Sequence, residues 1–274
     1  MTTGPLIALA VLLAAISAAV AVVYRGFARF RRLPANRPAV HRARPGRPAV
    51  VLLGASTIQG NVSFNIVDEL ARRLPDHDLV NAGINGNTSA QALARVPEVV
   101  ACRPDAVVVH IGANDALAMR GSRMARDVTV RPTVESFAAN LAAIVRALAP
   151  TGARIALMSI QPMGERPEAE INRDVDQIND AVRRTAATEG TGYLPLHERL
   201  TELLAERGTG RSAVDSPIPV LLAIVAHLGL GVPLDRIGRG NGYAVHTDGL
   251  HLASPGGLVA TDLVEDFVRG GAGG

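Results

Sequence analysis

The first regular feature of the chain is a continuous apolar segment at its N-terminus. From Pro5 to Val23 the only polar side chain is Ser17, and Tyr24 follows the segment. These nineteen residues would extend about 28 Å as a helix, close to the hydrocarbon thickness of a bilayer. The pattern predicts a membrane anchor at residues 1–24, followed by an Arg- and Pro-rich linker at 25–48 and a folded domain at 49–274.

The folded domain shows apolar runs of strand length that alternate with helical patterns. Four runs suit parallel strands that are buried on both faces: residues 49–54, 78–83, 105–112 and 154–160. Four further segments have the apolar spacing of amphipathic helices: residues 66–74, 90–100, 134–148 and 171–189. The alternation predicts a doubly wound, flavodoxin-like parallel sheet with helices on both faces, a three-layer α/β/α architecture.

Polar residues follow the predicted strands at the positions where a ligand would bind. In doubly wound sheets the ligand crevice lies beyond the carboxyl ends of the strands, which here means just after Leu53, Ala82 and Ile111. A serine or asparagine after a strand usually caps a helix or forms a turn. Together, however, four blocks supply every part that acyl transfer to water requires: Gly54-Ala55-Ser56-Thr57, Gly83-Ile84-Asn85-Gly86-Asn87-Thr88, Gly112-Ala113-Asn114-Asp115 and Asp248-Gly249-Leu250-His251.

With these four blocks in this order, the chain resembles the SGNH/GDSL hydrolase family from about residue 49 to residue 268. Residues 81–95 are similar to the second block of small bacterial thioesterases and lysophospholipases, which points to Gly86, not Gly83, as the oxyanion glycine. The first block departs from the family, which usually has Gly-Asp-Ser where this chain has Ala55 before the serine. The missing carboxylate affects the hydrogen bonding that supports the turn, but it leaves the nucleophile intact.

The same residues have a direct chemical interpretation as a catalytic triad. A serine hydroxyl is a poor nucleophile until a base accepts its proton. For Ser56 the candidate base is His251, and Asp248 is placed to fix its tautomer and stabilise the imidazolium that forms. His246 and His110 are rivals for the role of base, and we interpret both as structural residues.

Three groups are candidates for the oxyanion hole. They are the Ser56 N–H, the Gly86 N–H and the side-chain amide of Asn114, each of which would stabilise the charge that develops on the substrate carbonyl oxygen. Such a donor is typically worth about 10²- to 10³-fold in rate. Glycine at position 86 would let the backbone turn its N–H inward without a Cβ in the way. We expect Asp115 to hold a loop or to cap a following helix.

Composition and charge exclude several other classes of protein. Eight of the 28 basic residues and none of the 25 acidic ones lie in residues 1–47, so residues 48–274 carry a formal charge of −5. An acidic body with 3% aromatic residues is not that of a nucleic-acid-binding domain. Neither a metal-ligand motif nor a dinucleotide-binding glycine pattern is present, so we expect no metal and no cofactor. The single cysteine, Cys102, is interpreted as a packing residue.

The arginines after the apolar segment bear on topology. Arg25, Arg29, Arg31 and Arg32 follow the segment and no charged side chain precedes it, which predicts an uncleaved single-pass anchor with the catalytic domain in the cytoplasm. Small residues at 18–21 leave open a cleaved signal peptide and an exported protein. The linker is expected to be extended and solvated, close to anionic headgroups or simply a stop-transfer flank.

An apolar insert at about residues 209–245 does not fit the alternation of strands and helices. Between Pro219 and Gly231 it is apolar on every side except at His227, and it is too short to span a bilayer. Such a helix must be buried in something, either as a core helix or as a lid over the catalytic site that meets acyl chains or the membrane.

The sequence therefore predicts a membrane-tethered serine ester hydrolase. The anchor and the insert favour lipid-like esters or acyl thioesters as substrates. Two alternatives remain: a deacetylase of sugar or envelope polymers that uses the same residues, and a catalytically silent binding module. The sequence gives neither the acyl-chain length nor the oligomeric state.

Overall fold

A computed structural model describes residues 4–122, 124–125, 128, 130–207, 210–212 and 216–270. Its centre is a parallel sheet with the strand order β2-β1-β3-β4-β5, which is the flavodoxin-like order predicted from the sequence. The strands are β1 (Ala49–Gly54), β2 (Asp78–Gly83), β3 (Ala106–His110), β4 (Arg154–Met158) and β5 (Gly192–Leu194). The first four lie within the four predicted runs, and β5, with only three residues, was not predicted.

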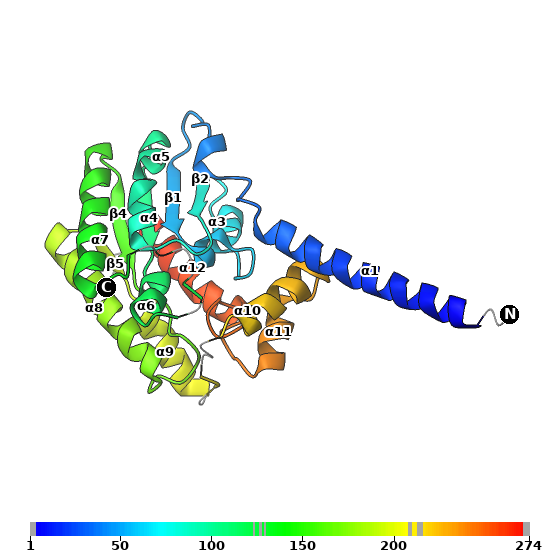
Figure 1. Cartoon of the computed structure of the whole chain (residues 1–274). Coiled ribbons are helices and arrows are strands. Elements are labelled where there is room, and N and C mark those ends of the chain that lie inside the picture. The colour runs from blue at the N-terminus through cyan, green and yellow to red at the C-terminus, as the bar shows by residue number, and fades with distance from the viewer. Residues whose placement is uncertain are drawn as a thin grey trace.

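Alternate residues of each strand face two separate hydrophobic cores. Val51 and Leu53 of β1 belong to one core, and Val50 and Leu52 belong to the other. The first core is closed by α4 (Ser89–Ala94), α5 (Val96–Ala101), α6 (Ala113–Met119), α7 (Val134–Leu148) and α8 (Glu170–Glu189). The second is closed by α3 (Ile66–Arg73), α9 (Leu196–Arg207) and α12 (Ser254–Arg269). The predicted three-layer architecture is thus confirmed (Figure 1).

One predicted helix is in fact two. The segment 90–100 forms α4 and α5, which are separated at Arg95. Pro97 lies at the start of α5, where its missing N–H costs no hydrogen bond, and it cannot continue a helix from α4. The break turns the Arg95 side chain back toward the strand ends, as described below.

The N-terminal helix is longer than the predicted anchor. α1 spans Gly4–Phe30, so it continues six residues beyond Tyr24 into the predicted linker. No proline occurs between Tyr24 and Pro34 to stop it. Most of α1 projects away from the domain (Figure 1), and the segment Leu6–Phe30 is long and apolar enough to cross a membrane.

The rest of the linker is partly bound to the domain and is not simply extended and solvated. Arg44 and Arg47 both form ion pairs with the buried carboxylate of Asp78 at the start of β2. Burial alone would raise the pKa of Asp78, but the two guanidinium groups lower it below its usual value. Asn36 also donates a hydrogen bond to the carbonyl of Leu79. Residues 31–48 therefore hold α1 close to the sheet edge.

The apolar insert forms three short helices beside α1. They are α10 (Ile218–Ala223), the π-helix η3 (Ile224–Gly229) and α11 (Leu234–Asn241). η3 packs on the C-terminal part of α1, where a Cβ on Gly229 would lie 2.8 Å from the Val22 carbonyl oxygen. The insert therefore packs mainly against α1, outside the two cores of the sheet. Residues 209 and 213–215 of the predicted insert lie outside the described residues.

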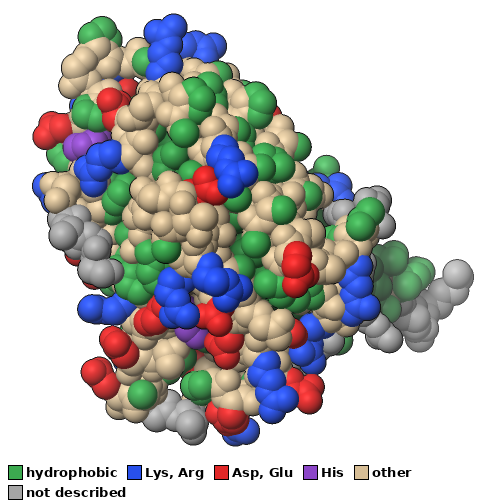
Figure 2. Space-filling view, turned by 90° about the vertical axis from the view of Figure 1, so that its left-hand side faces the viewer, with side chains coloured by type: hydrophobic (Ala, Val, Ile, Leu, Met, Phe, Trp, Pro, Cys, Tyr) green, Lys and Arg blue, Asp and Glu red, His purple; other side chains and the backbone are tan. Residues whose placement is uncertain are grey.

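The surface farthest from α1 carries many charged side chains (Figure 2), unlike the apolar surface of α1. Figure 2 shows acidic and basic side chains interspersed with apolar ones over this face. Ion pairs at the surface of the domain include Arg146 with Glu189 and Arg120 with Asp174. Such exposed pairs contribute little to stability.

Candidate active site

The carboxyl ends of β1, β2 and β3 bring the first three blocks together, and the loop before α12 adds the fourth, as the sequence predicts. Ser56 begins α2 (Ser56–Gln59) directly after β1, and its Oγ lies 2.9 Å from Nε2 of His251. The other ring nitrogen of His251, Nδ1, lies 2.8 Å from Oδ2 of Asp248. The three side chains thus form a continuous hydrogen-bonded relay with the geometry of a nucleophile, a base and an orienting carboxylate.

Asp248 is buried but well supplied with hydrogen-bond donors. Its Oδ1 accepts from the N–H groups of Leu250 and His251 at 3.0 and 2.9 Å. Burial alone would raise the pKa of Asp248, but the adjacent His251 and these backbone donors lower it, so the carboxylate is ionised. An ionised Asp248 is an acceptor for an Nδ1–H of His251, and in that tautomer Nε2, on the side of Ser56, would carry no proton.

The three oxyanion candidates lie around the same space. Ser56, Gly86, Asn114 and His251 all line one cavity of about 270 Å³. Asn114 donates a hydrogen bond to the Asn87 carbonyl at 2.9 Å, which fixes the amide against the loop that carries Gly86. The arrangement has the donors that a tetrahedral intermediate requires.

The reason for glycine at position 86 differs from the predicted one. A Cβ built on Gly86 would meet nothing within 4 Å, so space is not the constraint. Its φ is +79°, a left-handed conformation that a side chain disfavours. Gly83 is the opposite case, because a Cβ there would lie 2.2 Å from the backbone nitrogen of Gln59. Glycine is thus needed at position 83 because a side chain would collide with α2, and at position 86 because the backbone is left-handed there.

Asp115 joins the second and third blocks. Its carboxylate accepts hydrogen bonds from the N–H of Ser89 at 2.9 Å and from the Ser89 hydroxyl at 2.6 Å, at the first residue of α4. Burial raises the pKa of Asp115. The residue therefore holds the start of α4, a helix that precedes it in the chain, and it does not cap a following helix as one of the two predicted roles had it.

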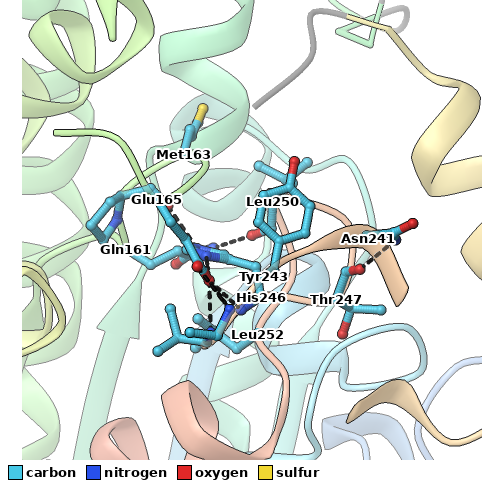
Figure 3. A network of polar contacts seen from close by, with 12 residues as sticks. Gln161, Met163, Glu165, Asn241, Tyr243, His246, Thr247, Leu250 and Leu252 are labelled. Atoms are coloured by element: carbon cyan, nitrogen blue, oxygen red, sulfur yellow. Dashed lines mark hydrogen bonds and ion pairs between the residues drawn. The ribbon is translucent and has the colours of Figure 1, made fainter. Parts of the chain in front are cut away.

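The rival histidines have other partners. His246 is fully buried, with Nδ1 3.2 Å from Oε1 of Glu165 and Nε2 2.9 Å from the carbonyl oxygen of Pro162 (Figure 3). His110 lies 3.1 Å from the side-chain oxygen of Gln161, and burial lowers its pKa to about 4. Both histidines are engaged in structural contacts, whereas His251 is hydrogen-bonded to Ser56.

Glu165 supports the loop that carries Asp248 and His251. Its carboxylate accepts hydrogen bonds from the backbone N–H groups of residues 244, 245 and 246 at 2.7 to 3.1 Å (Figure 3). Gln161 adds a second support, because its amide donates to the Leu250 carbonyl and to the Thr57 hydroxyl. The sequence reasoning missed both residues. They follow the end of β4, so the strand-end rule that selected the other blocks, applied to this strand, would have found them.

Arg95 is a third residue that the sequence reasoning missed. Its guanidinium donates to the carbonyl oxygens of Ala82 and Gly54, at the ends of β2 and β1, and to the side chain of Asn87. It thereby connects the first block, through the Gly54 carbonyl, with the second block, through the Asn87 side chain. Ala55, where the family usually has Asp, is buried in the first core, and its carbonyl oxygen accepts the first helical hydrogen bond of α2 from Gln59.

A second, mainly apolar cavity of about 200 Å³ adjoins the catalytic one. The two share Leu117, Met124, Val220 and Leu250 in their walls. Among the described residues, no three His, Cys, Asp or Glu side chains are grouped as metal ligands. Cys102 lies in the first core, away from both cavities, and burial raises the pKa of its thiol to about 11.

Comparison with known proteins decides the family. Residues 52–216 match the profile of the GDSL-like lipase/acylhydrolase family. The chain belongs to this family. The family profile ends before Asp248 and His251, so the positions of these two residues come from the structure and not from the match.

One curated relative is esterase TesA of Pseudomonas aeruginosa, which is 33% identical over 145 residues. The aligned region is 52% of this chain and 63% of the relative, so the chain spans less than two thirds of that protein's length.

Solved structures share the fold of this family member at low identity. The acetyl xylan esterase AlAXEase superposes with a TM-score of 0.60 at 17% identity, over 80% of this chain and 99% of that one. The acetylxylan esterase Axe2 of Geobacillus stearothermophilus superposes with a TM-score of 0.59 at 18% identity, over 82% and 94% of the two chains. At such identities the likeness concerns the fold alone.

Proposed function

We propose that the protein is a serine hydrolase of carboxylic esters in which Ser56 is the nucleophile, His251 the general base and Asp248 its orienting partner. The observation that carries this proposal is the relay of 2.9 and 2.8 Å from Ser56 through His251 to Asp248, at the wall of a cavity. Membership of the lipase/acylhydrolase family supports the same reaction class.

In the proposed mechanism Ser56 Oγ attacks the substrate carbonyl carbon while Nε2 of His251 takes the hydroxyl proton. The carbonyl oxygen becomes an oxyanion and accepts hydrogen bonds from the N–H groups of Ser56 and Gly86 and from the Asn114 amide. His251 then gives its proton to the leaving alcohol or thiol, and an acyl-enzyme remains. Water, deprotonated by His251, attacks the acyl-enzyme and releases the carboxylic acid and Ser56.

The lining of the cavities supports lipid-like esters or acyl thioesters as substrates. Leu117, Met124, Val220 and Leu250 are apolar, and together they would remove the methylenes of an acyl chain from water. Sugar polymers offer hydroxyl groups that need polar partners, and the four shared wall residues supply none, although Arg120, Glu170 and Asn85 line other parts of the two cavities. A deacetylase of such polymers is therefore the weaker candidate, and the intact relay argues against a silent binding module.

The membrane-spanning role of α1 is part of the proposal. α1 is apolar over the length of a bilayer, and arginines follow it directly. We infer a single-pass anchor that holds the hydrolase at a membrane surface, with the domain on the cytoplasmic side. An exported or secreted domain is the alternative.

The proposal is tested with full-length protein in detergent. Wild type should react with a fluorophosphonate and hydrolyse a series of para-nitrophenyl esters of increasing acyl length. Ser56→Ala should lose both activities, by at least about 10³-fold in kcat, because it removes the nucleophile while leaving the fold intact. The matched control is Ser63→Ala, which changes a buried serine that is hydrogen-bonded to Leu252 outside the relay. Unchanged turnover by a folded Ser56→Ala preparation would exclude the mechanism.

A further inference from the structure

The C-terminal end of α1 forms part of the catalytic cavity. Phe27 and Phe30 line the same cavity as Ser56 and His251. The Phe30 carbonyl accepts hydrogen bonds from the side-chain amides of Asn61 at 2.7 Å and Asn85 at 3.1 Å. Asn85 directly precedes the oxyanion candidate Gly86, so the end of α1 is bonded to the oxyanion loop.

The insert forms a further part of the cavity wall, next to α1. Val220, Leu221 and Ile224 of α10 and η3 also line the cavity. α1 and η3 are held together by close backbone contact at Gly26, where a Cβ would lie 3.2 Å from the Ile224 carbonyl oxygen. A hydrogen bond of 2.9 Å from Arg29 to the Leu228 carbonyl adds to this contact. The cavity is therefore lined on one side by a helix that is predicted to leave the membrane.

The depth of this wall matches the position of a lipid ester. If the hydrocarbon ends near Val23, Phe27 and Phe30 lie about 6 and 10 Å further along the helix axis. The interfacial zone on each side of a bilayer is about 5–8 Å thick. The ester carbonyls of glycerolipids occupy this zone, between the acyl chains and the headgroups. Phe27 thus lies within this zone and Phe30 just beyond it, so a lipid ester would reach the Phe27 side of the cavity without leaving the bilayer.

The exposed apolar surface of the protein lies mainly on α1 and on the insert that packs against it. Among the described residues, most of the exposed large apolar side chains belong to α1 and to the segment 218–230, including Ile218 at 60% and Leu222 at 64% exposure. A groove on α1 runs past Val20, Val23 and Tyr24 to Phe27, which lines the catalytic cavity as well. Phe27 therefore belongs both to the groove on α1 and to the cavity around Ser56.

We propose that the substrate is a long-chain ester of a membrane lipid that enters laterally from the bilayer between α1 and α10, with Phe27 and Leu221 lining the acyl path. The inference rests on the proposed function and adds the class of substrate and its route. It also makes α1 a structural part of the binding site, because removal of the helix would remove one wall of the cavity.

Two esters that differ in chain length and location test the route. The first is para-nitrophenyl palmitate embedded in phosphatidylcholine vesicles that carry the full-length protein, and the second is para-nitrophenyl acetate in water. Phe27→Ala and Leu221→Ala change cavity-lining residues of α1 and of α10, respectively. In each variant the ratio of palmitate to acetate kcat/KM should fall about tenfold, which corresponds to lost contact with about two methylenes.

A matched control lies on the same helix. Ile16→Ala removes an exposed apolar side chain from the middle of α1, at 51% exposure and away from the cavity. Its palmitate-to-acetate ratio should equal that of wild type. Gly229→Val is a further variant, because its side chain would displace α1 from η3 without changing a cavity-lining residue, and it should also lower the ratio.

The outcomes separate this inference from the proposed function. An unchanged ratio in Phe27→Ala and Leu221→Ala, or an equal loss on both esters with a lowered melting temperature, would overturn the lateral route while leaving the hydrolase intact. Wild-type protein that hydrolyses neither ester, and does not react with a fluorophosphonate, would instead contradict the proposed function.

Discussion

Two histidines that lie five residues apart in one loop meet different partners. Nε2 of His251 faces the Ser56 hydroxyl, whereas Nε2 of His246 faces the carbonyl oxygen of Pro162. A carbonyl oxygen can only accept a hydrogen bond, so that nitrogen of His246 carries a proton and cannot accept one from a serine. Residue type alone does not separate the two histidines, but the atoms around them do.

This difference predicts opposite consequences of replacing them. His251→Ala should lower kcat by at least about 10³-fold with little change in melting temperature, because it removes the base. His246→Ala should lower the melting temperature, because the buried Glu165 carboxylate loses its side-chain partner. Its kcat, measured below the new melting temperature, should stay within about tenfold of wild type. The reverse ranking of the two kcat values would move the base to His246.

At the scale of elements, the site is assembled by side chains that join strand ends. Arg95, between α4 and α5, is hydrogen-bonded to the ends of β1 and β2 and to the loop that carries Gly86. One planar guanidinium makes all three contacts, which an ammonium group on a flexible stem does not reproduce. The positions of Ser56 and Gly86 relative to each other thus depend on a residue that touches neither.

We therefore expect Arg95→Lys to lower kcat about 10- to 100-fold with a smaller effect on KM. Buried carbonyl groups that lose a partner cost about 1–3 kcal/mol each, so the melting temperature should fall as well. Steady-state kinetics on a short-chain ester and a melting curve are the measurements. Arg103→Lys, at the turn after α5, is the control and should match wild type. A drop in melting temperature without any change in kcat would make Arg95 a purely structural residue.

The sequence sufficed for the elements whose pattern is long and strong. β1, β2 and α7 have the predicted bounds, and the first three blocks meet because parallel strands end at one edge of the sheet, while the fourth comes from the loop before α12. β5 was missed because three residues carry no periodicity. The supports Glu165 and Arg95 were missed because their partners are backbone groups distant in the chain. The packing of α1 on η3 could not be predicted, because two apolar helices carry no signal of which surface each will meet.

At the scale of the whole molecule, the buried His110 links stability to pH. Its pKa is lowered from 6.5 to about 4 in the folded protein. Between these values the unfolded chain binds a proton that the folded protein does not, so stability falls as the pH is lowered through this window. The slope from this residue is at most about 1.4 kcal/mol per pH unit.

Asp115 also links stability to pH, but its raised pKa makes stability rise as the pH is lowered, opposite to the effect of His110. Replacing His110 alone separates the two effects. His110→Asn should be less stable than wild type at pH 7, and the difference in melting temperature between the two should shrink from pH 6.5 to pH 4. Melting curves of both proteins in detergent over this range are the measurement. A constant difference would mean that His110 does not titrate in this window.

The orientation of the molecule in the membrane is testable as a whole. Arginines follow α1 directly and no charged side chain precedes its apolar stretch, so the domain is expected on the cytoplasmic side. A reporter that is active only in the cytoplasm, fused after Gly274, should be active, and one that is active only after export should be silent. Activity of the exported reporter would place the domain outside and favour envelope substrates. The same fusion, analysed by size, tells whether α1 is retained.

The shared wall of α1 and the catalytic cavity has a kinetic consequence. An enzyme that takes its substrate from the bilayer responds to the number of substrate molecules per unit area of membrane, not to their concentration in the bulk solution. Adding inert phosphatidylcholine at constant total ester should therefore slow the full-length protein by surface dilution. The same addition should leave its hydrolysis of a water-soluble ester unchanged. The helix would thus let the enzyme search for its substrate in the two dimensions of the membrane and not in the three dimensions of the solution.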